Sequence, residues 1–510
     1  MRGQRPGFLD GASGIGRGIL HNPHRPHTRV TVRGVETIWS IAWLSSWVIR
    51  LVLAPIVIVR QKSPPIALAW LAVVMVLPWI GLVLYLLVGE QSLGYGRARR
   101  YAAQAHLEIT SKRPSAQAAW TIRPGIAERQ RVMVHVAESL GGLPILGANS
   151  VDLEGSATRF IERLIADINA AKHHVHLLYF IYEDDEVGKL VGDALIRAHE
   201  RGVVCRVLVD AAGSWSFLGT ASSRLERAGV KVVAALPAGN LRRRLARIDL
   251  RNHRKLAVID GAIAYAGSHN VIQPDYGMKD VGAWQDLSAR IVGPTVGQLQ
   301  AVFLEDWHFE TGEWPSDEGL FPDPATTGES PLQIVPTGPG EPNAVVRDVM
   351  IEALHLARRR VVLTTPYFVP DESLLGAIRL AVARGVQVDL VIPRKSDKWL
   401  CDAAGRYFCS ELAPLGVRVH FHQTGLLHAK VMTVDDDFAM LGSANFDIRS
   451  FFLNFELNLL IYDAQATAQL RFAQMTYIGQ SIEIPAAYWR VQPWHQRFGQ
   501  HAAKLLSPLL

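Results

Sequence analysis

Two copies of one short motif constrain the fold of this chain more than any other feature. The segment HRKLAVID (253–260) has the spacing HxKxxxxD, and GSHN (267–270) follows it. The same order recurs as HAKVMTVD (428–435) followed by GSAN (442–445). Because the two histidines are 175 residues apart, the pattern predicts an internal duplication in which each half carries one copy.

The sequence before each motif alternates between helical and strand patterns. Apolar residues at helical spacing alternate with short apolar runs of strand length, in the order helix, strand, helix, strand. The predicted elements are 156–172, 174–182, 185–202 and 203–210 in the first half, and 343–358, 360–369, 371–385 and 386–393 in the second. This alternation indicates an α/β fold class, with sheets covered by helices.

The two motifs suggest a site for an anionic group. KLAVID and KVMTVD are apolar around the lysine and predict buried strands, where residues two apart share a face. Histidine and lysine therefore lie together in each copy, and the Gly-Ser turns let a phosphate approach. Serine and asparagine there can donate hydrogen bonds to its oxygens. The candidate residues are His253, Lys255, Ser268 and Asn270, with His428, Lys430, Ser443 and Asn445.

If the halves pack face to face, two histidines suit a two-step displacement at phosphorus. One attacks and forms a phosphohistidine, and the other is the general acid and base. The lysines and asparagines stabilise the charge, so we expect no metal and no cofactor. Asp260 and Asp435 complete the catalytic motifs with a structural and electrostatic role, although an Asp-Gly pair can also merely shape a turn. The alternative is that each His-x-Lys is an ordinary strand pair facing solvent.

Two long apolar runs near the start predict membrane insertion. Residues 66–88 are 23 in number and uncharged, which is enough to cross a hydrocarbon core of about 30 Å. Residues 38–59 are similar but contain Arg50 and Pro55. A mid-span arginine is costly unless it finds a partner, so a re-entrant or interfacial segment is the alternative there. We expect two transmembrane helices.

Charge indicates the orientation. Arginines precede the runs (Arg25, Arg29, Arg33) and follow them (Arg97, Arg99, Arg100), with only Arg60 and Lys62 between them. The positive-inside rule then predicts that both ends are cytoplasmic. These arginines, with Arg242 to Arg244 and Arg247, either attract anionic headgroups or form a solvated face. A net charge of +6 and three cysteines decide nothing further.

The paired motifs resemble the signature of the phospholipase D superfamily. The segments 62–90, LVDAAGS (208–214), TTPYFVPD (364–371), RSFFLNFELNL (449–459) and LLSPLL (505–510) are similar to those of bacterial cardiolipin synthases. The resemblance implies two phospholipase D-like α/β/α domains packed as a pseudo-dimer. It also implies transfer of a phosphatidyl group between two phosphatidylglycerol molecules, giving cardiolipin and glycerol. The location implied is the bacterial inner membrane, with a multi-pass chain.

The resemblance also implies residue roles. His253 is expected to be the nucleophile and His428 the acid/base. Glu456 matches an acidic residue that orients a histidine, and Asp286 is its candidate counterpart in the first half. The sequence does not determine which histidine attacks, or the oligomeric state.

The expected organisation has six parts. These are a disordered basic segment (1–35), a membrane segment (36–90), a connecting region (91–150), a first domain (151–315), a linker (316–335) and a second domain with a C-terminal tail (336–510). The rival functions are a phospholipase D hydrolase, a superfamily nuclease and a non-enzymatic membrane scaffold with decayed motifs. The apolar runs argue against nucleic acid as a partner, as does the lack of basic residues interleaved with aromatics. Both motifs are intact, which argues against the scaffold.

Overall fold

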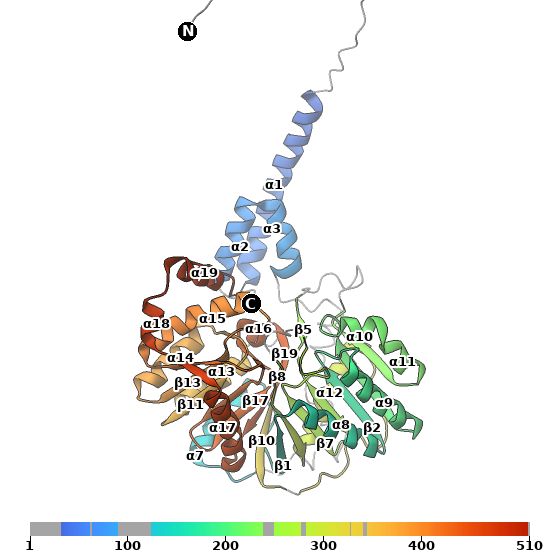
Figure 1. Ribbon diagram of the computed structural model, residues 1–510. Helices are drawn as coiled ribbons and strands as arrows, with labels where there is room; N and C mark the ends of the chain where they lie inside the picture. Colours follow the sequence, from blue (N-terminus) through green and yellow to red (C-terminus); the bar gives the residue numbers. More distant parts are fainter. Residues whose placement is uncertain are drawn as a thin grey trace, which may run out of the picture. The chain divides into compact units, whose positions relative to one another are not determined.

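The computed structural model describes residues 32–61, 64–89, 124–237, 249–276, 282–326, 328–339 and 344–507. It divides into two compact units, Met1–Leu84 and Tyr85–Leu510 (Figure 1). Most of the predicted disordered segment lies outside the described residues, as do the arginines at 97, 99, 100, 242–244 and 247.

The first unit contains one helix that is long and apolar enough to cross a membrane. Helix α1 (Val32–Arg60) carries a candidate span over Thr37–Arg60. Its 29 residues extend for about 44 Å at 1.5 Å per residue. Among the described residues no other helix meets this test.

The second apolar run was predicted to be one continuous span. The structure does not have that continuous helix. It forms α2 (Pro64–Val76) and α3 (Pro78–Leu84), followed by the π-helical turn η1 (Tyr85–Gly89). Pro78 has no N–H to continue the helix, and α3 folds back along α2. A Cβ atom built on Gly81 would therefore lie only 2.9 Å from the Cα of Val74. At 13 residues, α2 is about 20 Å long, too short to span.

Arg50 has partners within this unit. Its Nε donates to the Met75 carbonyl at 3.1 Å, and its Nη1 donates to Ser46 Oγ at 3.0 Å. Its guanidinium also lies over the Trp47 ring. The Met75 carbonyl is one of those left unpaired where α2 ends. The arginine that is costly in an isolated span thus stabilises the turn between α2 and α3.

The second unit is built on one 16-stranded mixed sheet that runs through both halves of the duplication. From one edge to the junction the order is β4, β3, β2, β6, β7, β9, β1, and from the junction to the other edge it is β10, β19, β17, β16, β11, β13, β14, β20. The sixteenth strand, β5 (Arg251–Asn252), pairs with β19 outside this order. The two orders correspond strand by strand, except for the additional β20. The bounds in the first half are β1 (Leu146–Glu154), β2 (His174–Tyr179), β3 (Val204–Asp210), β4 (Lys231–Ala235), β6 (Leu256–Ile259), β7 (Ile263–Gly267) and β9 (Ser288–Val292). Those in the second are β10 (Ser330–Thr337), β11 (Arg360–Thr364), β13 (Gln387–Pro393), β14 (Arg418–His422), β16 (Val431–Val434), β17 (Phe438–Gly442), β19 (Asn454–Ile461) and β20 (Ser481–Ile484).

The predicted α/β alternation is confirmed element by element. The four predicted helices correspond to α8 (Ala157–Ala170), α9 (Glu186–Glu200), α13 (Val345–Leu356) and α14 (Glu372–Ala383). The four predicted strands are β2, β3, β11 and β13, and the two motif strands are β6 and β16. Apolar side chains of these strands and helices make up the buried clusters of both halves.

The junction between the halves lies in ranges predicted as connecting segments. Strands β1 and β10 pair antiparallel there, through Leu146 with Leu332 and Asn149 with Ser330. Residues 330–335 of the predicted linker are therefore strand. Likewise α7 (Glu128–Leu140), from the predicted connecting region, packs on α13 and contributes Met133 to the core.

Candidate active site

His253 is held by a strand of the opposite half. The short strand β5 (Arg251–Asn252) pairs in parallel with the start of β19, at Asn454 and Phe455. The His253 N–H then donates to the Phe455 carbonyl at 2.9 Å. This main-chain pairing brings the first motif against the second half of the chain.

His428 is held in the same way by the first half. Strand β15 (Leu426–Leu427) pairs in parallel with β8 (Trp284–Gln285). The N–H groups of His428 and Ala429 both donate to the Gln285 carbonyl, at 2.9 and 3.0 Å. The two arrangements are equivalent, so each histidine begins its motif beside a strand of the other half.

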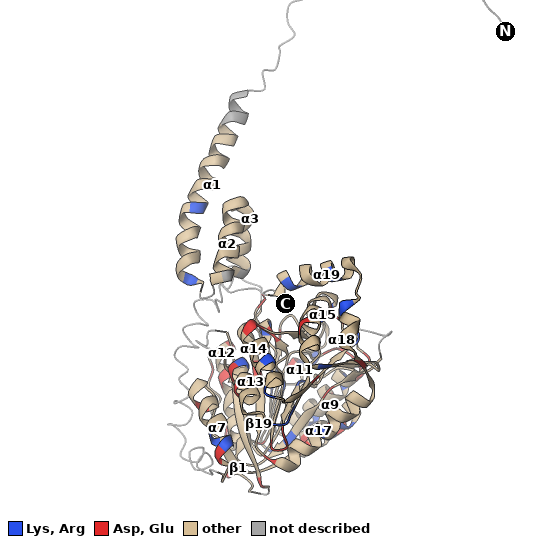
Figure 2. Cartoon of the chain, turned by 90° about the vertical axis from the view of Figure 1, so that its left-hand side faces the viewer, with Lys and Arg blue, Asp and Glu red and all other residues tan. Residues whose placement is uncertain are grey.

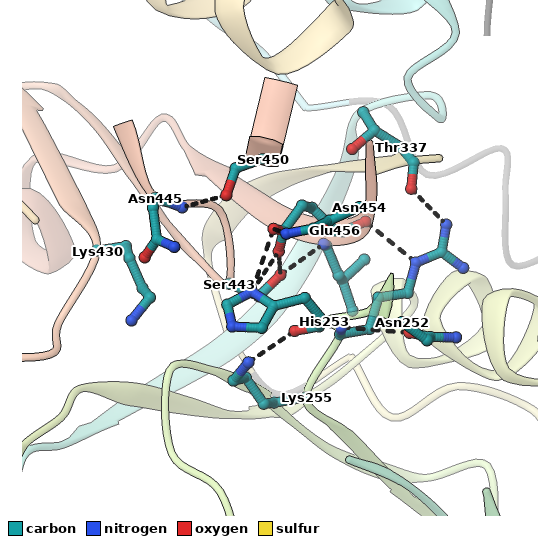
Figure 3. Close-up of polar contacts among 12 residues, drawn as sticks. Asn252, His253, Lys255, Thr337, Lys430, Ser443, Asn445, Ser450, Asn454 and Glu456 are labelled. Atoms are coloured by element: carbon teal, nitrogen blue, oxygen red, sulfur yellow. Dashed lines mark hydrogen bonds and ion pairs between the residues drawn. The ribbon is translucent and has the colours of Figure 1, made fainter. Parts of the chain in front are cut away.

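The carboxylates that contact the histidines are exchanged between the halves. His253 Nδ1 lies 3.0 Å from Oε2 of Glu456 on β19 (Figure 3). His428 Nδ1 lies 2.6 Å from Oδ1 of Asp286. All four residues are buried. A carboxylate that accepts from Nδ1–H fixes the tautomer and leaves the lone pair on Nε2. Each half therefore orients the imidazole of the other.

The two serine hydroxyls contact the acids that hold the histidines. Ser268 Oγ donates to Asp286 Oδ1 at 2.6 Å, and Ser443 Oγ donates to Glu456 Oε2 at 2.5 Å. Each hydroxyl thus holds a carboxylate of its own half. The prediction that these serines donate to phosphate is not supported by these contacts, because their one O–H is already given to an acid.

The two lysines are buried beside the histidines and link the motifs electrostatically. Lys255 Nζ donates to the His253 carbonyl at 2.7 Å, and Lys430 Nζ donates to the His428 carbonyl. The charge of Lys430 also acts on the pKa of His253, and that of Lys255 on His428. The cations of both motifs therefore lie in one cluster.

Burial dominates the pKa values of the cluster. It lowers the pKa of His253 and of His428 to about 4, because a charged imidazole would lose its hydration. The pKa of Asp286 is lowered well below its usual range by His428 and Lys430, against the opposing effect of burial. The site at neutral pH thus holds uncharged imidazoles beside ionised carboxylates. An uncharged imidazole is the form that attacks phosphorus.

The asparagines of the Gly-Ser turns lie in the same region. Asn270 Oδ1 accepts from the Ile181 N–H at 3.1 Å. This contact turns the amide nitrogen of Asn270 away from Ile181. Asn445 lies next to Lys430 (Figure 3), and its Oδ1 is buried without a hydrogen-bond partner. Asn445 thus has unused hydrogen-bonding capacity beside the cations.

The two motif aspartates lie at the far end of their strands from the histidines. Asp260 accepts from the N–H groups of Lys172, His173 and His174 at 2.7–2.9 Å. Asp435 accepts in the same way from three consecutive N–H groups, those of residues 358–360. The four residues of β6 lie between Lys255 and Asp260 and separate these two residues by about 13 Å or more. These contacts agree with the structural role expected for both aspartates, and a direct part in catalysis stays a prediction.

We expect Asp260→Ala to lower stability without lowering activity per folded molecule. The substitution leaves three N–H groups without their charged acceptor, which costs about 1–3 kcal/mol. Asp260→Asn is expected to cost less, because asparagine keeps one acceptor oxygen and tolerates the positive φ of 52° at this position. Thermal unfolding and kcat of both variants check this. A large fall in kcat with an unchanged Tm would return Asp260 to the catalytic set.

Three residues near the histidines escaped the sequence-based prediction. The Phe180 ring meets His253 edge-on at 4.9 Å and has Lys255 Nζ above it at 5.3 Å. Trp284 contacts the His428 ring at 4.5 Å, and Asn454 Nδ2 donates to Glu456 Oε1 at 3.2 Å. For two of the three the sequence position was a signal, because Trp284 and Asn454 each precede the histidine-orienting acid by two residues.

The lysines predict a pH-dependent affinity for anions. Burial lowers the pKa of Lys255 to about 7, although Glu456 and Asp286 oppose this. A bound dianion favours the ammonium form, so binding above pH 7 must take up a proton. Sulfate, which stays dianionic, is therefore expected to bind about tenfold or more weakly at pH 8.5 than at pH 6.5. Calorimetric titration measures this, and Lys255→Met is expected to flatten the dependence. Equal affinity at both pH values in the unaltered protein would contradict it.

The described residues contain no group of three or more histidines, cysteines, aspartates or glutamates arranged to hold a metal ion. The cationic groups that the site presents are Lys255 and Lys430. A scheme that uses no metal or cofactor stays a prediction.

Comparisons with known proteins agree with this arrangement. The family model "Cardiolipin synthase, PLD-like domain" matches residues 164–307 and again 350–475, so each match contains one motif. A second model, "Phospholipase_D-nuclease N-terminal", matches residues 46–90.

Curated relatives match along most of the chain. Cardiolipin synthase A of Cronobacter sakazakii is 36% identical over 89% of this chain and 95% of that protein. Cardiolipin synthase A of Serratia proteamaculans is 35% identical over 92% of this chain and 99% of its own length. The crystal structure of phosphatidylserine synthase from Haemophilus influenzae has a TM-score of 0.55 at 18% identity. It covers 74% of this chain and 100% of its own, and it shows likeness of fold.

Proposed function

Because this chain belongs to the cardiolipin synthase family of phospholipase D-like proteins, we infer that it is a phosphatidyltransferase that makes cardiolipin. It takes a phosphatidyl group from one phospholipid and gives it to another. We assign phosphatidylglycerol as both donor and acceptor, so that the second product is glycerol. The observation that carries this is the exchange of acids, Glu456 to His253 and Asp286 to His428, which unites both motifs in one site.

The first step forms a phosphohistidine. Nε2 of His253 attacks phosphorus, and the bond from phosphorus to the glycerol oxygen of the donor breaks. His428 gives its proton to the departing glycerol. The negative phosphodiester raises the pKa of His428, because it stabilises the imidazolium. Lys255, Lys430 and the two asparagines stabilise the charge that gathers on the non-bridging oxygens.

The second step transfers the phosphatidyl group. His428, now neutral, takes the proton of a glycerol hydroxyl of the acceptor lipid as its oxygen attacks phosphorus. The phosphorus–nitrogen bond breaks and frees His253, while His428 is protonated again for the next cycle. Glu456 and Asp286 stabilise the imidazolium character of their histidines through both steps.

A product assay tests this function. The purified full-length protein is incubated in detergent micelles with phosphatidylglycerol as the one phospholipid, and the products are identified by mass spectrometry. Cardiolipin and glycerol in equal amounts are expected. Phosphatidic acid without cardiolipin would mean that water takes the place of the acceptor, and the protein would then be a hydrolase.

The finer architecture and location also belong to this proposal. The two halves form a pseudo-dimer of phospholipase D-like domains, supported by their matching strand orders. Helix α1 anchors the protein in the inner membrane, and α2 and α3 form a re-entrant hairpin. The catalytic unit is cytoplasmic, supported by Arg97, Arg99 and Arg100, which follow the apolar runs in the sequence. Labelling single cysteines in intact cells with an impermeant reagent tests this, and labelling of the catalytic unit from outside would contradict it.

A further inference from the structure

The chain of the catalytic unit ends in an amphipathic helix whose apolar residues face outward. Helices α18 (Ala486–Arg490) and α19 (Trp494–Leu505) follow β20. One side of α19 packs on α15 (Trp399–Leu412), where Gln500 and Ala503 are buried. His501 meets Tyr407 of α15 edge-on at 4.8 Å, and Lys504 Nζ donates to the Tyr407 hydroxyl at 2.9 Å. These contacts fix which side of α19 points away from the protein.

The outward side carries a stripe of large apolar side chains. Trp494, Phe498 and Leu505 are 77%, 68% and 79% exposed. At 100° per residue they lie within about 40° of one another around the helix. The buried Gln500 and Ala503 lie on the opposite side by the same count. Val491, 79% exposed, lies just before α19. This pattern is the reverse of a helix that covers a core, because the apolar face is directed to the surroundings.

The charge around the stripe has one sign. The last acidic residue of the chain is Glu483, and the segment after it contains Arg490, Arg497 and Lys504. Figure 2 shows basic residues and no acidic ones along α18 and α19. By helical position Arg497 and Lys504 lie on one flank of the stripe. Tryptophan beside basic residues, around an apolar face, is typical of helices that lie in the interface of an anionic bilayer.

We propose that α19 is an interfacial helix that inserts Trp494, Phe498 and Leu505 into the surface of an anionic phospholipid bilayer. The proposal rests on the proposed function in one respect, since that function supplies an anionic lipid as substrate. The partner of the stripe is a lipid surface, because the flanking positive charges complement lipid phosphates. Burial of one tryptophan and one phenylalanine in that surface strengthens the binding. The helix gives the protein a second membrane contact, and it begins 434 residues after the end of α1.

Photocrosslinking in proteoliposomes tests the proposal. The full-length protein is prepared with p-benzoylphenylalanine in place of Phe498 and is reconstituted in vesicles of phosphatidylcholine and phosphatidylglycerol. A matched control carries the same residue in place of Phe472, which is 75% exposed on α17 (Ala464–Gly479). After irradiation, mass spectrometry identifies the adducts. Lipid adducts at 498 are expected to exceed those at 472 by about tenfold, as for a side chain within the acyl boundary against one in water.

Each other outcome overturns the proposal. Equal lipid adducts at 498 and 472 would mean that α19 has no special contact with lipid. Adducts from 498 to a second copy would make the stripe a contact between copies, and adducts to residues 1–123 would make it a contact within the chain. Equal lipid yields in vesicles of phosphatidylcholine alone would remove the preference for anionic lipid.

The readout is independent of turnover, so it separates this proposal from the proposed function. A hydrolase would give the same adducts as a synthase. The product assay in turn responds to catalysis in detergent micelles, where no bilayer surface is needed. We also expect Trp494→Ser with Phe498→Ser to raise the KM for phosphatidylglycerol in vesicles while kcat is kept, and Phe472→Ser to change neither.

Discussion

Replacing His253 by alanine is expected to lower kcat for cardiolipin formation by at least about 10⁴-fold, because the proposed scheme makes this residue the nucleophile that forms the covalent intermediate. His428→Ala removes the proposed general acid and base, and a fall of about 10²–10⁴-fold is expected. The two variants are distinguished with phosphatidylglycerol labelled at phosphorus. The label is expected to attach slowly to the His428→Ala protein and not at all to the His253→Ala protein.

The matched control is His355→Ala. His355 is an exposed histidine on α13, where it lies near Glu352 and far along the chain from either motif. Its replacement should leave kcat unchanged. Unaltered thermal unfolding of the two catalytic variants would show that the loss is chemical. If either of them kept more than about a tenth of the activity, the two histidines would not share one reaction, because general acid–base catalysis alone contributes 10²-fold or more.

Glu456→Gln is expected to lower kcat by about 10²–10⁴-fold, although the residue is 203 positions from the histidine that it serves. The amide has nearly the same shape and volume as the carboxylate. It carries no charge, so it cannot stabilise the imidazolium of His253, and it can present an N–H to Nδ1 and select the wrong tautomer. Asp286→Asn is expected to act in the same way through His428. Steady-state kinetics of both variants measure the effect.

Glu352→Gln on α13 is the matched control, since it makes the same chemical change at a partly exposed residue outside the site. It should retain full activity. Because Glu456 also accepts from Ser443 and Asn454, a small fall in Tm of the Glu456→Gln variant is compatible with the prediction. Activity above half of the unaltered protein would contradict it, and would mean that the contact between the halves holds the fold without orienting the histidine.

Local sequence patterns predicted the local elements well and the long-range pairings poorly. The helices and strands of both halves follow from periodicity, which acts over a few residues. The break at Pro78 was not predicted. The prediction of a continuous span rested on the 23 uncharged residues, although proline lacks the N–H that a continuous helix needs. Residues 330–335 were assigned to a linker because of the Gly, Pro and Ser before them. Their place in β10 depends on β1 and β19, which no local pattern reveals.

The site shows the same limit. The repeated spacing identified both histidines and both lysines, and the resemblance identified Glu456 and Asp286. Neither indicated that each acid contacts the histidine of the other half, because that depends on how β5 meets β19 and β8 meets β15. The contacts of Ser268 and Asp260 could not be predicted from the sequence for a related reason. A hydroxyl or carboxylate next to a motif binds the nearest partner in the fold, and that partner was a carboxylate for one and a run of backbone N–H groups for the other.

The shared sheet has a consequence for how a lipid reaches the histidines. The halves are joined by three separate backbone pairings: β1 with β10, β5 with β19 and β8 with β15. A clamshell motion would have to break these ladders and pull Glu456 and Asp286 away from their imidazoles. We therefore expect substrates to enter by displacing side chains and loops, while both contacts between imidazole and carboxylate are kept.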